Sequence, residues 1–494
     1  MSAGYKNRYN ILLITSDSQR TDSLSCMGSP FAYSPNLDSL AKSGVLFSQA
    51  HSCAPVCMPA RCSMMTGLHA PLHGCTENGL ERRDDLLFFT DTLKNSGYST
   101  LMAGKTHFGP IPDSFEIKLI TKGEKNSKGD DIFARQMALH GYSRSSSHPN
   151  PVPEEYCLES LIVDKTIESL EELKKNNNPF FAFCSLLSPH SPIDPPGRWM
   201  TDDIFRNKIP APLFGSGEWE TLPNSLKQFC GLPNNNQKNE IFPDNVHEAQ
   251  GNIADLLSID EMVSYRELYY RSAAYIDSLV GRLIDYLDSS GLRKNTLVIF
   301  TSDHGLQLFD HGFNDKHNYY DQSLRVPFIM SLPGVLPQNQ NCGFASHVDL
   351  APTITAAGGG IFDNANGFDL FTPLADGKDL PRHFAAASLY GSLALVTEKW
   401  KLEHYYFDNV FRLFDRINDP GETKNLAADP GYAGVTAALS RILLLWRSGL
   451  TDIDHLNKSA TSGGPVAMRV IDRIRTDKGR NNELLAEKFL RDIN

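Results

Sequence analysis

The chain has 494 residues, a length at which a single hydrophobic core stops growing, so we expect a large domain together with a smaller one. Hydrophobic residues make up 41% of the chain and charged residues 21%, a composition that excludes a disordered or collagen-like protein. The formal net charge of −11 argues against a nucleic-acid-binding protein, and no apolar run is long enough to span a membrane.

Cysteine usage and the N-terminus bear on the cellular compartment. Nine cysteines, an odd number scattered along the chain, are not typical of a disulfide-rich secreted domain, so we expect reduced thiols. The first predicted strand begins at about Asn10, which leaves no room for a basic and then apolar leader. The sequence as written therefore predicts a cytoplasmic protein, or a periplasmic or secreted one whose leader has been removed.

Apolar strand-like runs and helical segments alternate along the first 300 residues. The patterns predict strands at 10–16, 180–186 and 297–302, and helices at 34–43 and 262–287. This order is typical of an α/β fold with a large, mainly parallel sheet sandwiched by helices. Asp17 and Asp303 follow two of the strands directly. We expect them at the carboxyl edge of the sheet, where such folds place their sites.

The rest of the chain contains two long connections and, after about residue 380, a different pattern of predicted secondary structure. The polar segments 110–155 and 194–258 are longer than ordinary loops, and loops of that length usually carry specificity or cover a site. After about residue 380 short β-like pieces precede a predicted helix at 432–446. The pattern predicts one domain over 1–380 and an α+β subdomain with a helical tail over 381–494. The apolar face of that tail must pack on something, for which we expect a second copy of the chain in a homo-oligomer.

The segment Pro55-Val-Cys57-Met-Pro59-Ala-Arg61 carries the strongest chemical signal. Pro59 suits the first turn of a helix, which places Cys57 at the helix entrance and Arg61 one turn further along the same face. A helix N-terminus offers free N–H groups, and Arg61 adds a fixed cation with paired donors. The segment therefore predicts an anion pocket. A lone cysteine in such a place is more often a buried structural thiol, so the rest of the chain has to decide.

Further charged residues and histidines follow predicted strands. They are Lys105 and His107 in Gly97-Tyr-Ser-Thr-Leu-Met-Ala-Gly104-Lys105-Thr-His107, His190 in Ser188-Pro-His190-Ser-Pro192, and Asp303, His304 and Lys316 in and after Thr301-Ser-Asp303-His304-Gly305. Each alone would be an ordinary loop or surface residue. Of these, Asp303 and His304 together with Asp17 would offer mostly hard oxygen ligands and one imidazole, which suits Ca²⁺, Mg²⁺ or Mn²⁺.

In this order the segments resemble those of the formylglycine-dependent sulfatases of the alkaline phosphatase superfamily. Cys57-x-Pro59-x-Arg61 resembles the signature whose cysteine is oxidised to formylglycine, and Asp419-Pro-Gly-Glu-Thr-Lys-Asn425 looks like part of the family's terminal domain. The resemblance runs from about residue 10 to about residue 450. It implies an alkaline-phosphatase-like fold, a catalytic domain over 1–380 and a sulfuric ester hydrolase.

The resemblance also implies roles for individual residues. The implied catalytic set is Cys57, Arg61, Lys105, His107, His190 and Lys316, and the implied metal site is Asp17, Ser18, Asp303, His304 and residue 57, with Ca²⁺ as the first choice. Lys105, Lys316 and Arg61 would neutralise the sulfuryl oxygens while a hydroxyl of the hydrated aldehyde attacks sulfur. His190 would protonate the departing alcohol, and His107 would take the proton that releases sulfate. We assign Asn78 to substrate binding, and a formylglycine-generating maturation enzyme is the implied partner.

Three positions depart from the family pattern, and the first of them, Ala60 in place of the common Ser, is a tolerated variation that leaves Cys57, Pro59 and Arg61 intact. Position 18 is Ser where many members have a second metal-binding Asp, which weakens the predicted ligand set. Phe309 stands where Gly is usual in the segment before Lys316.

Three other functions compete with sulfate ester hydrolysis. Phosphonate monoester or phosphodiester hydrolases share the formylglycine, the fold and the metal segment, but Lys105 and His107 favour the sulfatase. A non-catalytic binding protein is disfavoured because every implied position except Ser18 keeps a competent residue. A cysteine phosphatase needs five residues between Cys and Arg, where three stand here.

For the substrate we predict a sulfated carbohydrate. The long loops are polar and contain Trp199 and Trp219, which suit stacking on sugar rings. The membrane-inserting segments of steroid sulfatases have no counterpart here. Arg82 and Arg83 are candidates for a second anionic group, although a solvated surface pair is the commoner role for such residues.

Overall fold

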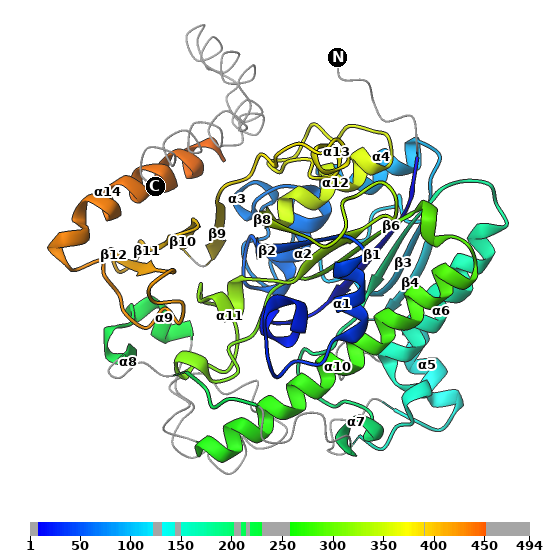
Figure 1. Cartoon of the computed structure of the whole chain (residues 1–494), viewed down its shortest axis with the longest axis horizontal. Helices are drawn as coiled ribbons and strands as arrows, with labels where there is room; N and C mark the ends of the chain where they lie inside the picture. The colour runs from blue at the N-terminus through cyan, green and yellow to red at the C-terminus, as the bar shows by residue number, and fades with distance from the viewer. Residues whose placement is uncertain are drawn as a thin grey trace, which may run out of the picture.

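The computed structural model describes residues 8–121, 131–143, 150–201, 209–213, 218–229, 257–389 and 391–450. In this part of the chain a large sheet lies between two layers of helices, and a small antiparallel sheet with one long helix follows it (Figure 1). The predicted helical tail lies outside the described residues. No helix in the described part is both long and apolar enough to cross a bilayer.

The central sheet has eight strands in the order β4-β3-β5-β1-β6-β7-β2-β8. They are β1 (Asn10–Ser16), β2 (Val45–His51), β3 (Ser99–Lys105), β4 (Ile117–Thr121), β5 (Phe180–Ser185), β6 (Thr296–Ser302), β7 (Phe328–Ser331) and β8 (Gln340–Ser346). β7 runs antiparallel to β6 and β2, and the other pairs are parallel. The predicted large, mainly parallel sheet is confirmed.

Burial on both faces explains why the central strands read as continuous apolar runs. In β1, Ile11 and Leu13 belong to the core on one face of the sheet, and Leu12 and Ile14 belong to the core on the other. All four side chains are at most 1% exposed. The alternation is the period of two that a strand imposes on its side chains.

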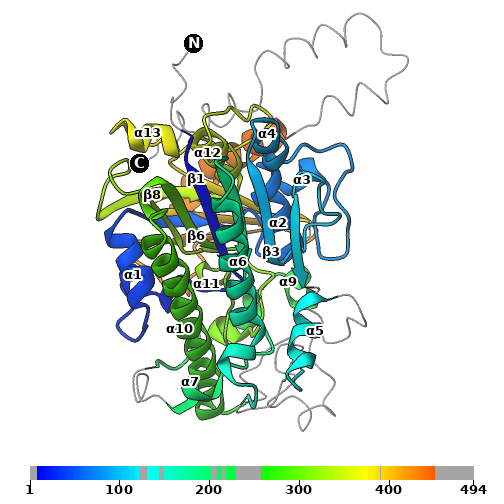
Figure 2. The same ribbon diagram turned by 90° about the vertical axis from the view of Figure 1, so that its right-hand side faces the viewer.

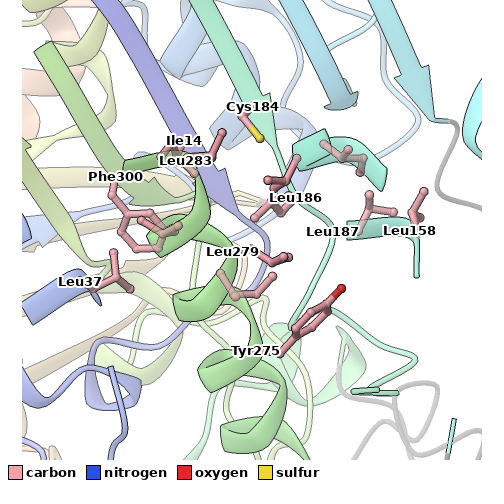
Figure 3. Packing of buried hydrophobic residues seen from close by; sticks show 14 of the residues in the cluster. Ile14, Leu37, Leu158, Cys184, Leu186, Leu187, Tyr275, Leu279, Leu283 and Phe300 are labelled. Carbon is pink, nitrogen blue, oxygen red and sulfur yellow. The ribbon is translucent and has the colours of Figure 1, made fainter. Parts of the chain in front are cut away.

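Helices cover both faces of the sheet (Figure 2). One face carries α1 (Pro35–Lys42), α5 (Ile132–Leu139), α6 (Leu158–Lys174), α7 (Gly197–Thr201) and α10 (Ile259–Ser289), and the other carries α2 (Cys57–Thr66), α3 (Ala70–His73), α4 (Phe89–Asn95), α12 (Leu350–Ala357) and α13 (Phe371–Ala375). Leu279 and Leu283 of α10 share a buried cluster with Ile14 and Phe300 of the sheet (Figure 3). The helix predicted at 262–287 therefore packs directly on the central sheet.

The C-terminal sheet is antiparallel in the order β12-β11-β10-β9. Its strands are β9 (Ala385–Leu389), β10 (Ser392–Val396), β11 (Trp400–Tyr405) and β12 (Val410–Asp415), and α14 (Ala433–Gly449) packs on it. Three short helices, α8 (Glu218–Thr221), α9 (Asn224–Phe229) and α11 (Asp321–Leu324), share a buried cluster with this small sheet. β9 was not predicted, because its sequence Ala-Ala-Ala-Ser-Leu lacks the β-branched and aromatic residues that favour strands. The domain division near residue 380 stays a prediction.

Candidate active site

The predicted site residues lie together at the carboxyl edge of the central sheet. Asp17 follows β1, Lys105 ends β3, His190 follows β5 and Asp303 follows β6. The register pairs Thr15 of β1 with Ser185 of β5 and with Thr301 of β6, so the three strand ends are level. Parallel pairing therefore brings together residues that are almost 300 positions apart in the chain.

Close strand packing at this edge depends on one glycine. Gly104 has a φ of +98°, and a Cβ at this position would lie 1.9 Å from the carbonyl oxygen of Ser185. A side chain would force β3 away from β5, so the residue before Lys105 must be glycine.

Cys57 is the first residue of α2 and only 1% exposed. The next backbone N–H, that of Met58, donates to the side-chain oxygen of Asn78 at 3.0 Å. Asn78, which we predicted as a substrate-binding residue, thus caps the helix that carries Cys57 while it remains exposed to solvent. Its contact in this structure is with the helix backbone.

Cations surround the Cys57 sulfur. The Sγ atom lies 3.1 Å from Nε2 of His304 and 3.5 Å from Nζ of Lys316. Burial alone raises the pKa of this thiol, but Lys316, Lys105 and His304, with a hydrogen bond from His107, outweigh burial and hold the pKa well below its usual value. The pocket therefore stabilises negative charge at position 57.

Arg61 bridges the two carboxylates of the site. Its Nε donates to Oδ2 of Asp303 at 2.7 Å, its Nη2 to Oδ2 of Asp17 at 3.1 Å and its Nη1 to Oγ of Ser185 at 2.8 Å. The guanidinium is 1% exposed. We expected Arg61 to meet sulfuryl oxygens, but each of its nitrogens has a protein partner beneath the pocket. In this structure Arg61 orients the carboxylates.

Asp17 accepts from more cations than Asp303 does. Besides Arg61, Lys105 donates to Oδ2 of Asp17 at 2.5 Å. Burial and the Cys57 sulfur raise the pKa of Asp17, and Lys105, His190 and Arg61 lower it, with the net result well below its usual value. Asp17 is therefore ionised at neutral pH.

The donor set fits a hard divalent metal. One ligand atom from each of Asp17, Cys57, Asp303 and His304 lies within 4.8 Å of the others, and all four residues are buried. Nδ1 of His304 lies 2.8 Å from the carbonyl oxygen of Gly305, which can only accept, so Nδ1 carries the proton and Nε2 faces the set. Such an outer hydrogen bond is the usual orienting contact of a metal-binding imidazole.

Ser18 lies beside this set. Its hydroxyl donates to Oδ1 of Asp17 at 2.9 Å, and its backbone N–H donates to Oδ1 of Asp303 at 3.1 Å. Its φ of +63° is in the left-handed region, which Asp tolerates better than most residues do. Position 18 can therefore carry either Ser or the Asp that many family members have.

His190 and Lys316 form the opposite wall of the pocket. Nε2 of His190 lies 2.9 Å from Nζ of Lys316, whose side chain is 5% exposed. Nδ1 of His190 donates to the carbonyl oxygen of Ser191 at 2.7 Å, so Nε2 is the ring nitrogen that faces the pocket. Burial lowers the pKa of Lys316, but Cys57 and Asp315 raise it further, and the ammonium stays charged.

The segment before Lys316 explains the third departure from the family pattern. Phe309 has a φ of +75°, a left-handed conformation in which glycine is the usual residue. The Phe309 ring is fully buried and packs edge-on against Tyr265 of α10 at 5.5 Å between centroids. The packing offsets the backbone strain.

Several polar residues of the site were not predicted. Ser185 ends β5 and holds Arg61, and its strand-end position, level with that of Asp17, is the signal that could have found it. His317 follows Lys316, and burial first and then Lys316 and His304 lower its pKa, although Asp315 and Cys57 raise it. No sequence motif marks His317.

The arginine pair proposed for a second anionic group has other partners. Arg82 is 8% exposed and donates to the backbone carbonyls of Phe108, Arg83 and Pro110. Arg83 forms an ion pair with Asp85 at 2.8 Å. The Arg82 donors are therefore used within the protein.

Comparisons with known proteins identify the family. Residues 9–361 match the family model described as Sulfatase, and residues 309–448 match that of the N-sulphoglucosamine sulphohydrolase C-terminal region. The chain belongs to the sulfatase family. Together with relatives that are named sulfatases, this membership makes the protein a sulfuric ester hydrolase.

Individual relatives cover most of this sulfatase. It is 26% identical to an N-acetylglucosamine-6-O-sulfatase of Bacteroides thetaiotaomicron, over 88% of this chain and 86% of that protein. It is 27% identical to the multifunctional alkaline phosphatase superfamily protein PehA of Trinickia caryophylli, over 92% and 97%. A phosphonate monoester hydrolase structure from Agrobacterium radiobacter aligns with a TM-score of 0.76 at 23% identity, over 90% of this chain and 96% of that one. The last comparison shows the shared fold.

Proposed function

We propose that this sulfatase removes sulfate from a sulfated carbohydrate, with a formylglycine made from Cys57 as nucleophile and one divalent metal, first of all Ca²⁺, beside it. The observation that carries the proposal is the electrostatic environment of position 57. A fully buried group at the entrance of α2 has Lys316, Lys105 and His304 around it, and they favour its negative form. A sulfate ester brings the same sign of charge to the same place.

The nucleophile would be one hydroxyl of the hydrated aldehyde at position 57. Asp17, Asp303 and His304 would hold the metal, whose Lewis acidity favours an ionised nucleophile near neutral pH. That hydroxyl oxygen forms the new bond to sulfur. Lys105 and Lys316 offset the charge on the sulfuryl oxygens, because fixed cations in a water-poor pocket need no reorganisation as the transition state develops.

Two histidines would move the protons. His190 would give a proton from Nε2 to the departing alcohol oxygen as the sulfur–oxygen bond breaks, with the Lys316 ammonium, 2.9 Å from Nε2, as the neighbouring proton donor. His107, whose hydrogen bond reaches position 57, accepts the proton of the second hydroxyl. The carbon–oxygen bond to sulfate then breaks, the aldehyde returns and sulfate leaves. Each proton transfer contributes roughly 10²- to 10⁴-fold to the rate.

The carbohydrate part of the proposal is supported by a relative named N-acetylglucosamine-6-O-sulfatase. The tryptophans give it little support. Trp199 is 6% exposed and donates to Glu154, and the half-buried Trp219 packs against Phe313 at 5.6 Å. Both indoles are engaged in packing, so stacking on sugar rings falls to other residues.

Mass spectrometry and parallel kinetics test the proposal. The peptide that contains residue 57, taken from protein made together with a formylglycine-generating enzyme, should carry the aldehyde, and active protein should contain one metal ion per chain. The matured protein should hydrolyse 4-nitrophenyl sulfate faster than a phosphonate ester of 4-nitrophenol. Full activity with unmodified cysteine would overturn the nucleophile, and faster phosphonate turnover would favour the phosphonate hydrolases.

Defined sulfated oligosaccharides test the substrate class. Release of sulfate from at least one glycosaminoglycan or algal saccharide should exceed that from simple alkyl sulfates. Turnover of alkyl sulfates alone would contradict the carbohydrate assignment and leave the sulfatase assignment intact.

A further inference from the structure

Glu159 is a buried carboxylate for which the mechanism above has no use. It lies in the first turn of α6 and is 7% exposed. Its Oε1 accepts the hydroxyl proton of Ser188 at 2.7 Å. Burying a carboxylate costs free energy, which the N-terminus of α6 offsets only in part. A buried acceptor needs a donor, and the hydroxyl of Ser188 supplies it.

Ser188 belongs to the turn that carries His190. The turn is closed by the His190 N–H, which donates to the carbonyl oxygen of Leu187 at 3.1 Å. The Ser188 carbonyl oxygen accepts from the backbone N–H of Asp17. Ser188 is thus held from two sides, by the metal-site strand through its backbone and by α6 through its hydroxyl.

The start of the turn is fixed by packing. Leu186 and Leu187 lie in the buried cluster beside Leu158 and Tyr275 (Figure 3). Leu187 is 4% exposed and Leu158, the residue before Glu159, is 6% exposed. Apolar contact and the Glu159–Ser188 hydrogen bond therefore join the same two segments side by side.

The orientation of His190 follows from these contacts. Its Nδ1 is bound to Ser191, and its Nε2 lies beside Lys316, where the departing oxygen would stand. A shift of the turn by about 1 Å would misplace Nε2, and misplacements of that size cost about 10²-fold in rate.

We infer that Glu159 is a positioning residue for His190: through Ser188 it fixes the turn so that Nε2 faces the leaving-group oxygen. The inference rests on the proposed role of His190 as the leaving-group acid. It predicts a specific kinetic signature, because protonation matters for an alkoxide leaving group and hardly at all for 4-nitrophenolate.

The experiment compares the variants H190A, E159A, E159Q and the double variant on 4-nitrophenyl sulfate and on a sugar sulfate or alkyl sulfate. H190A should lower kcat/KM for the poor leaving group by 10²-fold or more, and leave 4-nitrophenyl sulfate within a few fold. E159A should lower kcat/KM about tenfold for the sugar or alkyl sulfate and less than twofold for 4-nitrophenyl sulfate. E159Q should restore most of the loss because its amide oxygen accepts the same bond, and adding E159A to H190A should cause no further loss.

Ser160→Ala is the matched control. It removes the neighbouring buried bond from Ser160 Oγ to Tyr275 Oη, 2.8 Å long, which joins α6 to α10 rather than to the turn. It should lower thermal stability about as much as E159A without any dependence on the leaving group.

Equal losses on both substrates in E159A, or a further loss in the H190A background, would overturn the inference. So would an H190A variant without leaving-group dependence. Turnover of 4-nitrophenyl sulfate by the unsubstituted enzyme is measured in the same series. Its absence would contradict the proposed function, whereas the variants test the role of Glu159.

Discussion

Among the clusters of buried charge in the described part of the chain, two differ in how their charges are arranged. In the C-terminal charge cluster, formed by Asp321, Lys401, Arg416 and Glu422, opposite charges alternate: Lys401 contacts Asp321 and Glu422, both at 2.5 Å, and Arg416 contacts Asp321 at 3.1 Å. In the active site the cations Lys105 and Lys316, together with the imidazole of His304, surround the single sulfur of Cys57.

The difference separates two uses of buried charge. The C-terminal charge cluster pairs its cations with carboxylates and joins β11 to the segment that follows the active-site lysine. The active site also contains ion pairs, of Arg61 and Lys105 with Asp17, but Lys105 and Lys316 lie around position 57 as well, where we propose that the sulfate ester binds. Burial of charge by itself therefore does not mark a site, and cations also gather around Asp321 in the C-terminal charge cluster. What distinguishes the active site is that its cations gather around a nucleophilic group. Changes in the first cluster should cost stability, and changes in the second should cost turnover.

The largest effect is expected for Asp303→Asn. The amide keeps the shape of the side chain but removes the negative charge that Arg61 and the proposed metal need, so kcat should fall about 10²- to 10³-fold, the size of loss seen when a preorganised electrostatic group is removed. Metal content, measured by elemental analysis, should fall below one ion per chain. Normal turnover with full metal content would remove Asp303 from the site.

For Lys401→Met we expect a smaller effect, and on stability instead of turnover. The side chain is fully buried, and its loss leaves Glu422 and Asp321 with uncompensated charge, which typically costs about 3–5 kcal/mol of unfolding free energy. Urea unfolding measures this loss, and kcat per folded molecule should stay within about twofold. A variant of unchanged stability but low kcat would show that the two clusters are coupled.

The smallest effect is expected for Ser18→Asp, which tests the departure from the family pattern. A third carboxylate beside Asp17 and Asp303 should tighten Ca²⁺ binding by about tenfold, the order of change that groups around a metal contribute. Without metal the same charge should lower the melting temperature because the carboxylates repel one another. Ser18→Ala is the control, and equal Ca²⁺ affinity in all three proteins would place position 18 outside the ligand set.

The sequence predicted the elements whose pattern is local and long. The strands at 10–16, 180–186 and 297–302 and the helix at 262–287 are confirmed within a few residues, because apolar runs and helical periodicity report burial directly. The reversed direction of β7 was not predictable in the same way, since pairing depends on neighbours that are far away in the chain.

The sequence predicted which residues form the site, but it did not predict which partners each of them contacts. Strand ends and motif order brought Cys57, Asp303 and Lys316 together in the prediction, and the structure has them adjacent. That Arg61 would bind the carboxylates of Asp17 and Asp303 rather than face the pocket depends on the packing of strands that are far from it in the chain. No sequence pattern pointed to Glu159, because a Glu in the first turn of a helix is common.

The burial of Cys57 has a consequence for the order of events in biosynthesis. The thiol is 1% exposed and every residue of Cys57–Thr66 is buried, so the folded protein offers a modifying enzyme neither the sulfur nor the Pro59 and Arg61 around it. If Cys57 is oxidised as proposed, the oxidation has to reach an extended chain, before β1, β5 and β6 close over the segment. A molecule that folds before it is oxidised would keep an inaccessible, unmodified Cys57 and would be inactive, and adding the maturation enzyme afterwards would not restore activity. The yield of active enzyme then depends on the rate of modification relative to the rate of folding.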